Sequence, residues 1–141
     1  MKKIFYTLLI FCTLFLSSCN VFKELKEGMN NALKTSQDFC EALSNDNYYL
    51  ASEYLHPDST PNKTSLESYI SNLEVKNGID FSNGVTFKRR YSFSSTYYDS
   101  AYDGSVHELG YELVIGTDNV NCFFTVVSND IGYGIYSFGI E

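Results

Sequence analysis

Four polar or charged residues fall at regular positions in two segments whose polarity alternates from residue to residue. Arg89 and Tyr91 occupy apolar-phase positions in residues 85–93, and His107 and Tyr111 are in phase with the apolar positions of residues 107–115. Alternate side chains of a strand share one face, so all four are expected to face inward. A guanidinium, an imidazole and two phenols at the open end of a sheet could hold an anionic or hydroxylated ligand. Arg89, Tyr91, His107 and Tyr111 are therefore candidates for the lining of a ligand pocket.

Arg89 has a second interpretation, because a charge that faces the interior costs free energy unless it is paired. It could form a structural ion pair with a helix carboxylate such as Asp38 or Glu41. It could also lie near the edge of the sheet, where the guanidinium reaches water. Either arrangement would remove Arg89 from the pocket.

No motif for catalysis or metal binding is present. The chain lacks G-x-S-x-G, H-E-x-x-H and a phosphate-binding loop. Its two histidines are far apart, and His56 is best explained as the end of a helix. The cysteines do not have the spacing of metal ligands. We predict no catalytic residue, no metal site and no cofactor.

The N-terminus has the pattern of a secretory signal. Lys2 and Lys3 precede an apolar run over residues 4–16, which is 13 residues long and too short to span a membrane. Leu16, Ser17, Ser18 and Cys19 resemble the lipobox of bacterial lipoproteins. The alternative is an ordinary signal peptide with an accidental cysteine. The resemblance implies that residues 1–18 are removed and that Cys19 carries a diacylglycerol by which the protein is anchored to a membrane.

The lipoprotein signal also implies a location. We expect a lipid-anchored protein of the cell envelope, on the periplasmic or the surface side, with residues 19–20 as the lipidated N-terminus. Asn20 follows the cysteine where aspartate favours inner-membrane retention, so the outer membrane is the expected site in a cell with two membranes.

Charge and length limit the remaining possibilities. Loss of residues 1–18 leaves 123 residues, enough for one domain over residues 21–141. It also removes Lys2 and Lys3, which takes the formal net charge from −7 to −9. Such an acidic chain is unsuited to phosphate backbones, so we expect no nucleic acid partner.

Two cysteines remain in the processed chain after Cys12 is removed and Cys19 is acylated. Outside the cytoplasm Cys40 and Cys122 could form a disulfide. They could equally be two buried thiols, since free cysteine packs as a small hydrophobic residue. The sequence leaves both possibilities open.

Helices are predicted in the first half of the processed chain and strands in the second. Apolar residues recur at steps of three and four over residues 22–43, 48–55 and 66–73, and the pattern T-x-x-E at Thr64 and Glu67 predicts a capping box. Strands are expected over residues 85–93, 107–115, 120–128 and 133–140, joined by short turns. Tyr97, Tyr98 and Tyr102 either form a hairpin tip or contact a protein or glycan. Short connections favour antiparallel neighbours and a four-stranded meander.

Helices followed by a curved antiparallel sheet define an α+β fold with the helices on one face. The order of elements over residues 21–141, with the helix, break and helix at 39–56, resembles the cone of the nuclear transport factor 2-like superfamily, whose domain is cystatin-like. That superfamily usually has a short strand between its early helices, where this chain has only the polar residues 57–63. The resemblance implies that an enzyme of isomerase or dehydratase type, using inward His107 or a carboxylate, is one hypothesis.

The favoured hypothesis is a non-enzymatic domain that binds an envelope protein or a small ligand through the concave face of the sheet. The first helix could instead form a short coiled coil, but its spacing also suits a helix that lies on the sheet. We expect a monomer.

Overall fold

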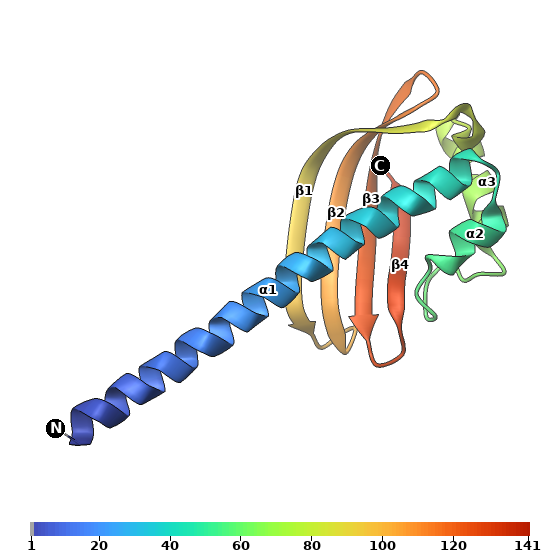
Figure 1. Ribbon diagram of the computed structural model, residues 1–141. Helices are drawn as coiled ribbons and strands as arrows, with labels where there is room; N and C mark the ends of the chain where they lie inside the picture. The colour runs from blue at the N-terminus through green and yellow to red at the C-terminus, as the bar shows by residue number, and fades with distance from the viewer. Residues whose placement is uncertain (1) are drawn as a thin grey trace.

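The computed structural model describes the backbone of residues 2–141 and the side chains of residues 20–141 (Figure 1). The side chain of Cys19, and with it the predicted lipid site, lies outside the described residues. The first element is a continuous helix, α1 (Lys2–Ser44), which contains the helix expected over residues 22–43. Within residues 20–141, no helix has the length and apolar character that a membrane crossing requires.

Two short helices follow α1. Asp46 adopts a left-handed conformation (φ 53°) after α1 ends. Asn47 then caps α2 (Tyr48–Glu53), because its side-chain oxygen accepts a hydrogen bond of 3.0 Å from the amide of Leu50.

The predicted capping box of the third helix is wrong. Helix α3 (Leu66–Asn77) begins after Ser65, which makes no side-chain cap. Instead, the side-chain oxygen of Asn62 accepts from the amides of Thr64 and Ser65. The helix ends at Gly78 in the left-handed conformation (φ 67°), as a C-terminal glycine favours. A 3₁₀ turn, η1 (Phe81–Asn83), leads into the sheet.

The sheet is the predicted four-stranded meander. Its strands β1 (Val85–Asp99), β2 (Gly104–Ile115), β3 (Asp118–Asn129) and β4 (Tyr133–Ile140) pair in sequence order, all antiparallel. Tyr97 and Tyr98 lie at the end of β1, and Tyr98 donates a hydrogen bond of 2.7 Å to Asp103 in the turn before β2. Strands β1 and β2 pair down to Asp99 and Gly104, so these tyrosines belong to a hairpin, one of the two possibilities considered from the sequence. The α+β class is confirmed.

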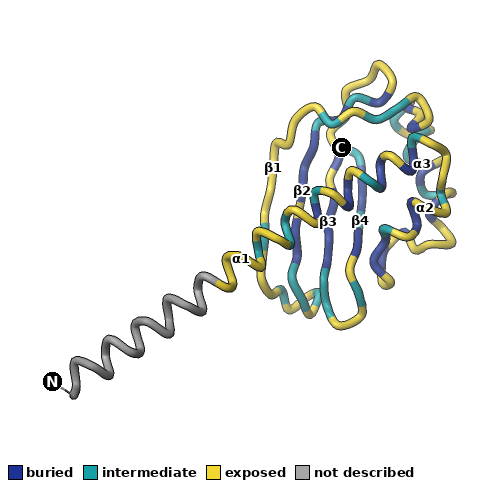
Figure 2. Tube along the Cα trace, in the orientation of Figure 1, coloured by how far each residue is buried: buried dark blue, intermediate teal, exposed yellow. Residues whose placement is uncertain are grey.

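The two edges of the sheet differ. The segment after α2 runs along β4: Ile135 exchanges backbone hydrogen bonds with Tyr54 (2.8 Å) and His56 (2.9 Å), which gives an isolated parallel bridge at Leu55. These bonds pair the backbone groups of Ile135 on the outer edge of β4. In contrast, β1 is exposed along most of its length (Figure 2).

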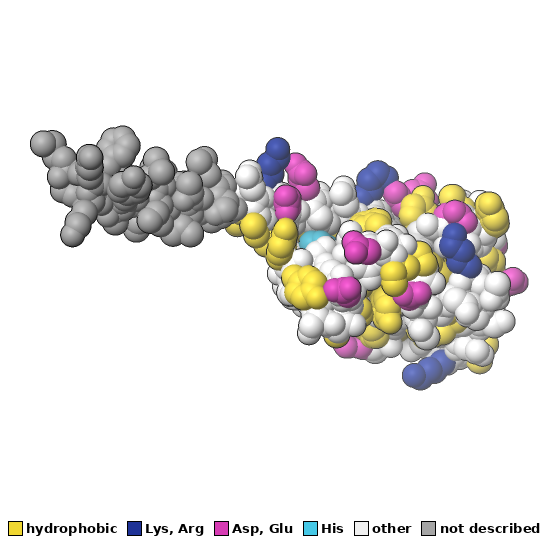
Figure 3. All heavy atoms as spheres, turned by 90° about the horizontal axis from the view of Figure 1, so that it is seen from below, with side chains coloured by type: hydrophobic (Ala, Val, Ile, Leu, Met, Phe, Trp, Pro, Cys, Tyr) yellow, Lys and Arg dark blue, Asp and Glu magenta, His cyan; other side chains and the backbone are white. Residues whose placement is uncertain are grey.

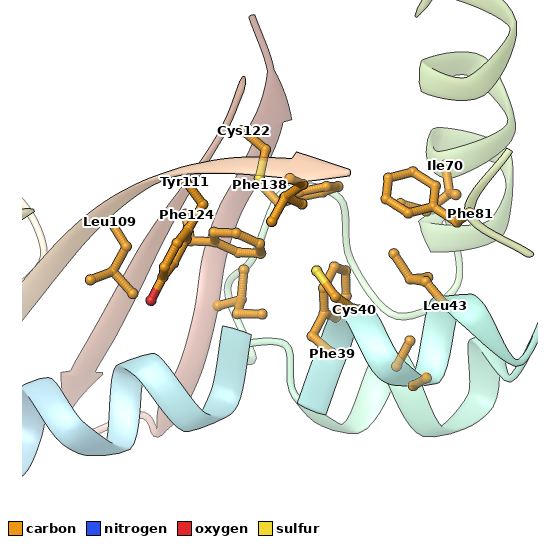
Figure 4. Packing of buried hydrophobic residues seen from close by; sticks show 14 of the residues in the cluster. Phe39, Cys40, Leu43, Ile70, Phe81, Leu109, Tyr111, Cys122, Phe124 and Phe138 are labelled. Atoms are coloured by element: carbon orange, nitrogen blue, oxygen red, sulfur yellow. The ribbon is translucent and has the colours of Figure 1, made fainter. Parts of the chain in front are cut away.

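Helix α1 crosses the concave face of the curved sheet, while α2 and α3 lie near the C-terminal end of α1 (Figure 1). The core lies between α1 and the sheet. Phe39 of α1 is fully buried and packs edge-on against Phe124 (ring centroids 6.4 Å apart) and Phe138 (5.4 Å), as Figure 4 shows. Truncating such a ring to alanine costs about 3–5 kcal/mol, so this contact fixes the helix on the sheet.

Candidate functional site

The structure separates the four residues predicted to form one pocket. Strand β1 contains register shifts between Phe87 and Arg89 and between Arg90 and Ser92. Each bulge adds one residue to β1 and changes which face the following side chains occupy. The expectation that Arg89 and Tyr91 face inward is therefore wrong, whereas His107 and Tyr111 on the unbulged β2 do face the core.

Arg89 lies on the convex face and remains 71% exposed. Its Nη2 atom is 3.3 Å from Oε2 of Glu112, and Nζ of Lys88 is 2.7 Å from Oε1 of the same carboxylate. The hydrogen bond from Lys88 is the main reason why the pKa of Glu112 is lowered. Arg89 therefore pairs with Glu112 on the neighbouring strand β2 and not with Asp38 or Glu41. It lies on the edge strand with its guanidinium exposed to water, which is the second of the two structural arrangements considered from the sequence.

Tyr91 also lies on the convex face, where its ring covers a glycine. Leu109 and Tyr111 point into the core, so a Cβ atom on Gly110 would point outward. That position lies 2.7 Å from Cε2 and 2.8 Å from Cζ of Tyr91. On β3, Phe123 covers Gly139 in the same way, with its Cζ atom 2.4 Å from the Cβ position.

These rings form one surface, which we call the convex aromatic stripe: Tyr91, Gly110, Phe123 and Gly139. Phe123 is paired in register with Gly110 on one side and Gly139 on the other, so the stripe crosses all four strands. Tyr91 is 42% and Phe123 39% exposed. Each glycine lets a ring approach the backbone, as occurs when an aromatic residue packs over a glycine in a sheet.

His107 is buried between β1 and α1. Its Nδ1 atom lies 2.6 Å from Oγ of Ser95, and its Nε2 atom faces Gly28 of the helix. Burial lowers the pKa of His107, which favours the neutral imidazole. A serine hydroxyl within hydrogen-bond reach of a neutral imidazole is the pair from which a nucleophile can be activated. Ser95 was not predicted, because a serine in a strand carries no distinguishing sequence signal.

Tyr111 lies on the concave face, but its side chain packs into the core and does not line an open pocket. Its ring packs edge-on against Phe87 (4.8 Å) and Phe124 (6.1 Å), and its hydroxyl oxygen is directed towards α1 (Figure 4). Burial raises the pKa of this phenol. The sequence predicted that a ligand could reach the concave face, but α1 and the aromatic core occupy it.

An apolar groove lies between the exposed part of α1 and β1. It has a volume of about 400 Å³ and is lined by Phe22, Leu25, Lys26, Met29, Phe93 and Ser95. Hydrophobic side chains gather on this side of the molecule, at the end where α1 leaves the sheet (Figure 3). The sequence showed the apolar spacing of the helix. It did not show that Phe93 faces this helix, because that depends on the register of β1. We call this surface the α1–β1 groove.

The two cysteines of the domain are free thiols. Cys40 on α1 and Cys122 on β3 are both fully buried, and burial raises the pKa of each thiol. Of the two arrangements left open by the sequence, the structure has buried thiols. Among the described side chains, no group of three His, Cys, Asp or Glu residues is placed to hold a metal ion.

Fold and surfaces together define an α+β domain whose concave face is closed by its own N-terminal helix. Comparison with known proteins adds no relative, since no protein family, curated protein or solved structure matches the chain.

Proposed function

We propose that this protein is a membrane-anchored lipoprotein of the cell envelope whose domain is a non-enzymatic interaction module. The lipobox-like residues 16–19 support the anchor at Cys19. The domain begins directly after that residue, because α1 continues through it into the core. A domain joined so closely to a lipid remains at the membrane surface and meets other envelope proteins there.

The observation that carries the proposal is the convex aromatic stripe. Two partly exposed rings lie at the centre of the convex face, which also carries the polar side chains Ser92, Ser94 and Glu108. Aromatic residues are enriched at the centre of protein interfaces and charged residues at the rim. Lys88, Arg89 and Glu112 provide such a rim. Because α1 fills the concave face, the partner surface proposed here is the convex face.

The rings are also held in position before any partner binds. Tyr91 and Phe123 each rest against a glycine backbone, so they have little freedom to lose on binding. Fixing a flexible side chain costs about 0.5–1.5 kcal/mol on association. A pair of pre-positioned rings avoids that cost and favours a protein partner with an apolar patch.

Site-specific crosslinking tests this proposal. A photoreactive phenylalanine analogue at Phe123, in cells, should give one discrete protein adduct, and Tyr91→Ala should abolish it. The matched control carries the photoreactive analogue at position 75, since Val75 is exposed on α3. An adduct that survives Tyr91→Ala, or that forms equally from position 75, contradicts the convex face as the binding surface. Cys19→Ser tests the anchor separately and should release the protein from membranes.

The nuclear transport factor 2-like superfamily remains our proposal for the ancestry of the domain. In the sequence, the polar residues 57–63 stand where this superfamily usually has a short strand between its early helices. The bridge between Leu55 and Ile135 lies at the corresponding place in the chain and supports the proposal.

A second candidate function is an enzyme, and the pair formed by Ser95 and His107 favours it. Ser95 lines the α1–β1 groove, and its hydroxyl is 2.6 Å from the imidazole. This geometry suits a serine nucleophile better than the isomerase or dehydratase chemistry considered from the sequence. A fluorophosphonate probe should label Ser95 and fail to label the His107→Gln variant; no labelling of the native protein argues against the enzyme.

A further inference from the structure

We propose that the α1–β1 groove is a second membrane contact, which docks the domain against a bilayer that contains anionic lipids. This inference rests on the proposed lipid anchor at Cys19. It adds that the domain lies on the membrane in one fixed orientation, with Phe22 and Phe93 at the boundary between headgroups and acyl chains.

The first argument is the exposure of large apolar side chains. Phe22 is 72% and Phe93 41% exposed, although they belong to elements far apart in sequence. Leu25 and Met29 lie half-buried between them. Apolar side chains from α1 and β1 thus line one exposed groove, as an apolar helix face does where it lies in a membrane interface.

The second argument is the distance from the anchor. Phe22 follows Cys19 by three residues in α1, which corresponds to roughly 4.5 Å along the helix axis. A diacylglycerol on Cys19 would therefore bring Phe22 to the membrane interface, and the groove continues from Phe22 to β1.

The third argument is the distribution of charge. Within residues 20–141, the cations without a carboxylate within 4.0 Å are Lys26, Lys76 and Arg90. Lys26 lines the groove, and the Arg90 guanidinium lies 5.1 Å from the centroid of the Phe93 ring. Two of the three thus flank the apolar surface of an otherwise acidic protein.

The acidic residues of this part of α1 point away from the groove. Glu24 and Glu27 are about half a turn from Phe22 and Met29 on the helix. Basic residues beside an apolar helix face are typical of attachment to anionic membranes.

Tryptophan fluorescence of the full lipidated protein provides the test, because the chain contains no tryptophan. Three single variants are placed in vesicles of phosphatidylcholine and phosphatidylglycerol with brominated acyl chains. Phe22→Trp reports the anchor, Phe93→Trp reports docking of the sheet, and Tyr49→Trp on the exposed surface of α2 is the control. We expect bromine quenching at positions 22 and 93 and none at position 49.

Charge substitutions test whether the basic residues beside the groove contribute to docking. Lys26→Gln or Arg90→Gln, in the Phe93→Trp background, should lower the ratio of docked to undocked protein about fivefold. Lys76→Gln on α3 should leave it unchanged. Quenching at position 22 is expected to persist in all three variants, and circular dichroism checks that each is folded.

The outcomes separate this inference from the anchor itself. Quenching at position 22 without quenching at position 93 keeps the anchor and overturns docking. Quenching at neither position overturns both. A blue shift at position 93 that depends on protein concentration and not on bromine would mean that a second copy covers the groove, which also overturns docking.

Discussion

The Nε2 atom of His107 lies 2.6 Å from the position that a Cβ atom would take on Gly28. No real Cβ tolerates a neighbour this close, so the buried imidazole occupies the space that only a glycine leaves on the helix. The other ring nitrogen, Nδ1, is held at 2.6 Å by Ser95. His107 therefore has little room to move, and this contact sets how closely α1 approaches β2.

Gly28→Ala should destabilise the protein, although alanine favours helix. In an exposed helix interior this substitution would stabilise by about 1 kcal/mol. Here the new methyl group also meets Cε1 of His107 at 3.0 Å, and overpacking of this kind costs about 1–3 kcal/mol. Urea unfolding should therefore show a net loss of stability.

A double-mutant cycle identifies the cause of that loss. In the His107→Ala background the clash is absent, so Gly28→Ala should become neutral or stabilising. Asn30→Ala, on the exposed surface of the same helix, is the control for helix propensity and should stabilise in both backgrounds. Equal losses from Gly28→Ala with and without His107 would refute the contact.

Stability should fall on mild acidification because of His107. Burial lowers its pKa from the ordinary value of 6.5, so just below pH 6.5 the unfolded chain binds a proton that the folded chain does not. The free energy of unfolding then rises with pH in this window, by at most about 1.4 kcal/mol per pH unit for one proton. The contribution is complete above pH 6.5 and is lost as pH falls towards the folded pKa.

The pH dependence of urea unfolding between roughly pH 5 and 7, the range in which histidine titrates, measures this effect. His107→Gln should flatten the profile in that range, because glutamine does not titrate. His56→Gln leaves His107 in place and serves as the comparison. A His107→Gln profile as steep as that of the native protein would assign the slope to other groups.

The sequence predicted most elements of the fold because their patterns are local. Apolar residues at steps of three and four identified the buried face of α1 from Ala32 to Leu43, and alternation in β2 placed His107 and Tyr111 correctly. No comparable signal marks the bulges of β1 between Phe87 and Arg89 and between Arg90 and Ser92. A bulge shifts the phase of a strand by one residue without any particular composition, so simple alternation placed Arg89 and Tyr91 on the wrong face.

The surfaces argued here depend on contacts between elements, which no local pattern contains. The stripe requires Tyr91 to reach across to Gly110, and the groove requires Phe93 to face α1. Both follow from the register between strands and from the path of the helix. The apolar face expected for this helix begins at Phe22, which in the structure is 72% exposed.

Tyr111→Phe should stabilise the domain. The Tyr111 hydroxyl is buried and has no hydrogen-bond partner among the described residues. The hydroxyl of Ser36 opposes the effect of burial on the pKa of this phenol, but it donates its own proton to the carbonyl of Leu33 and makes no hydrogen bond to Tyr111 that satisfies the geometric criteria. Removing an unsatisfied buried hydroxyl should add about 1 kcal/mol to the free energy of unfolding.

Tyr133→Phe is the matched control for this prediction. Its hydroxyl is hydrogen-bonded to Oγ1 of Thr35 at 3.0 Å, so the same chemical change should reduce stability by about 1 kcal/mol. Opposite signs in urea unfolding are expected for the two variants. A loss of stability from Tyr111→Phe would mean that Oγ of Ser36 or a bound water accepts a hydrogen bond from the hydroxyl in solution.

The thiols of Cys40 and Cys122 should be inert in the folded protein and reactive only after unfolding. Both are fully buried, and burial raises the pKa of each thiol, which disfavours the thiolate that reacts with alkylating reagents. Iodoacetamide at mildly alkaline pH should leave both residues unmodified in the native state and should alkylate both in urea without reductant. Absence of alkylation in urea, with reaction restored by reductant, would instead establish a disulfide between them.

Cys40→Ser provides the internal check. Burying a hydroxyl in place of the thiol should destabilise the core by about 1–3 kcal/mol. If the thiols are free, Cys122 should still be alkylated in urea as before.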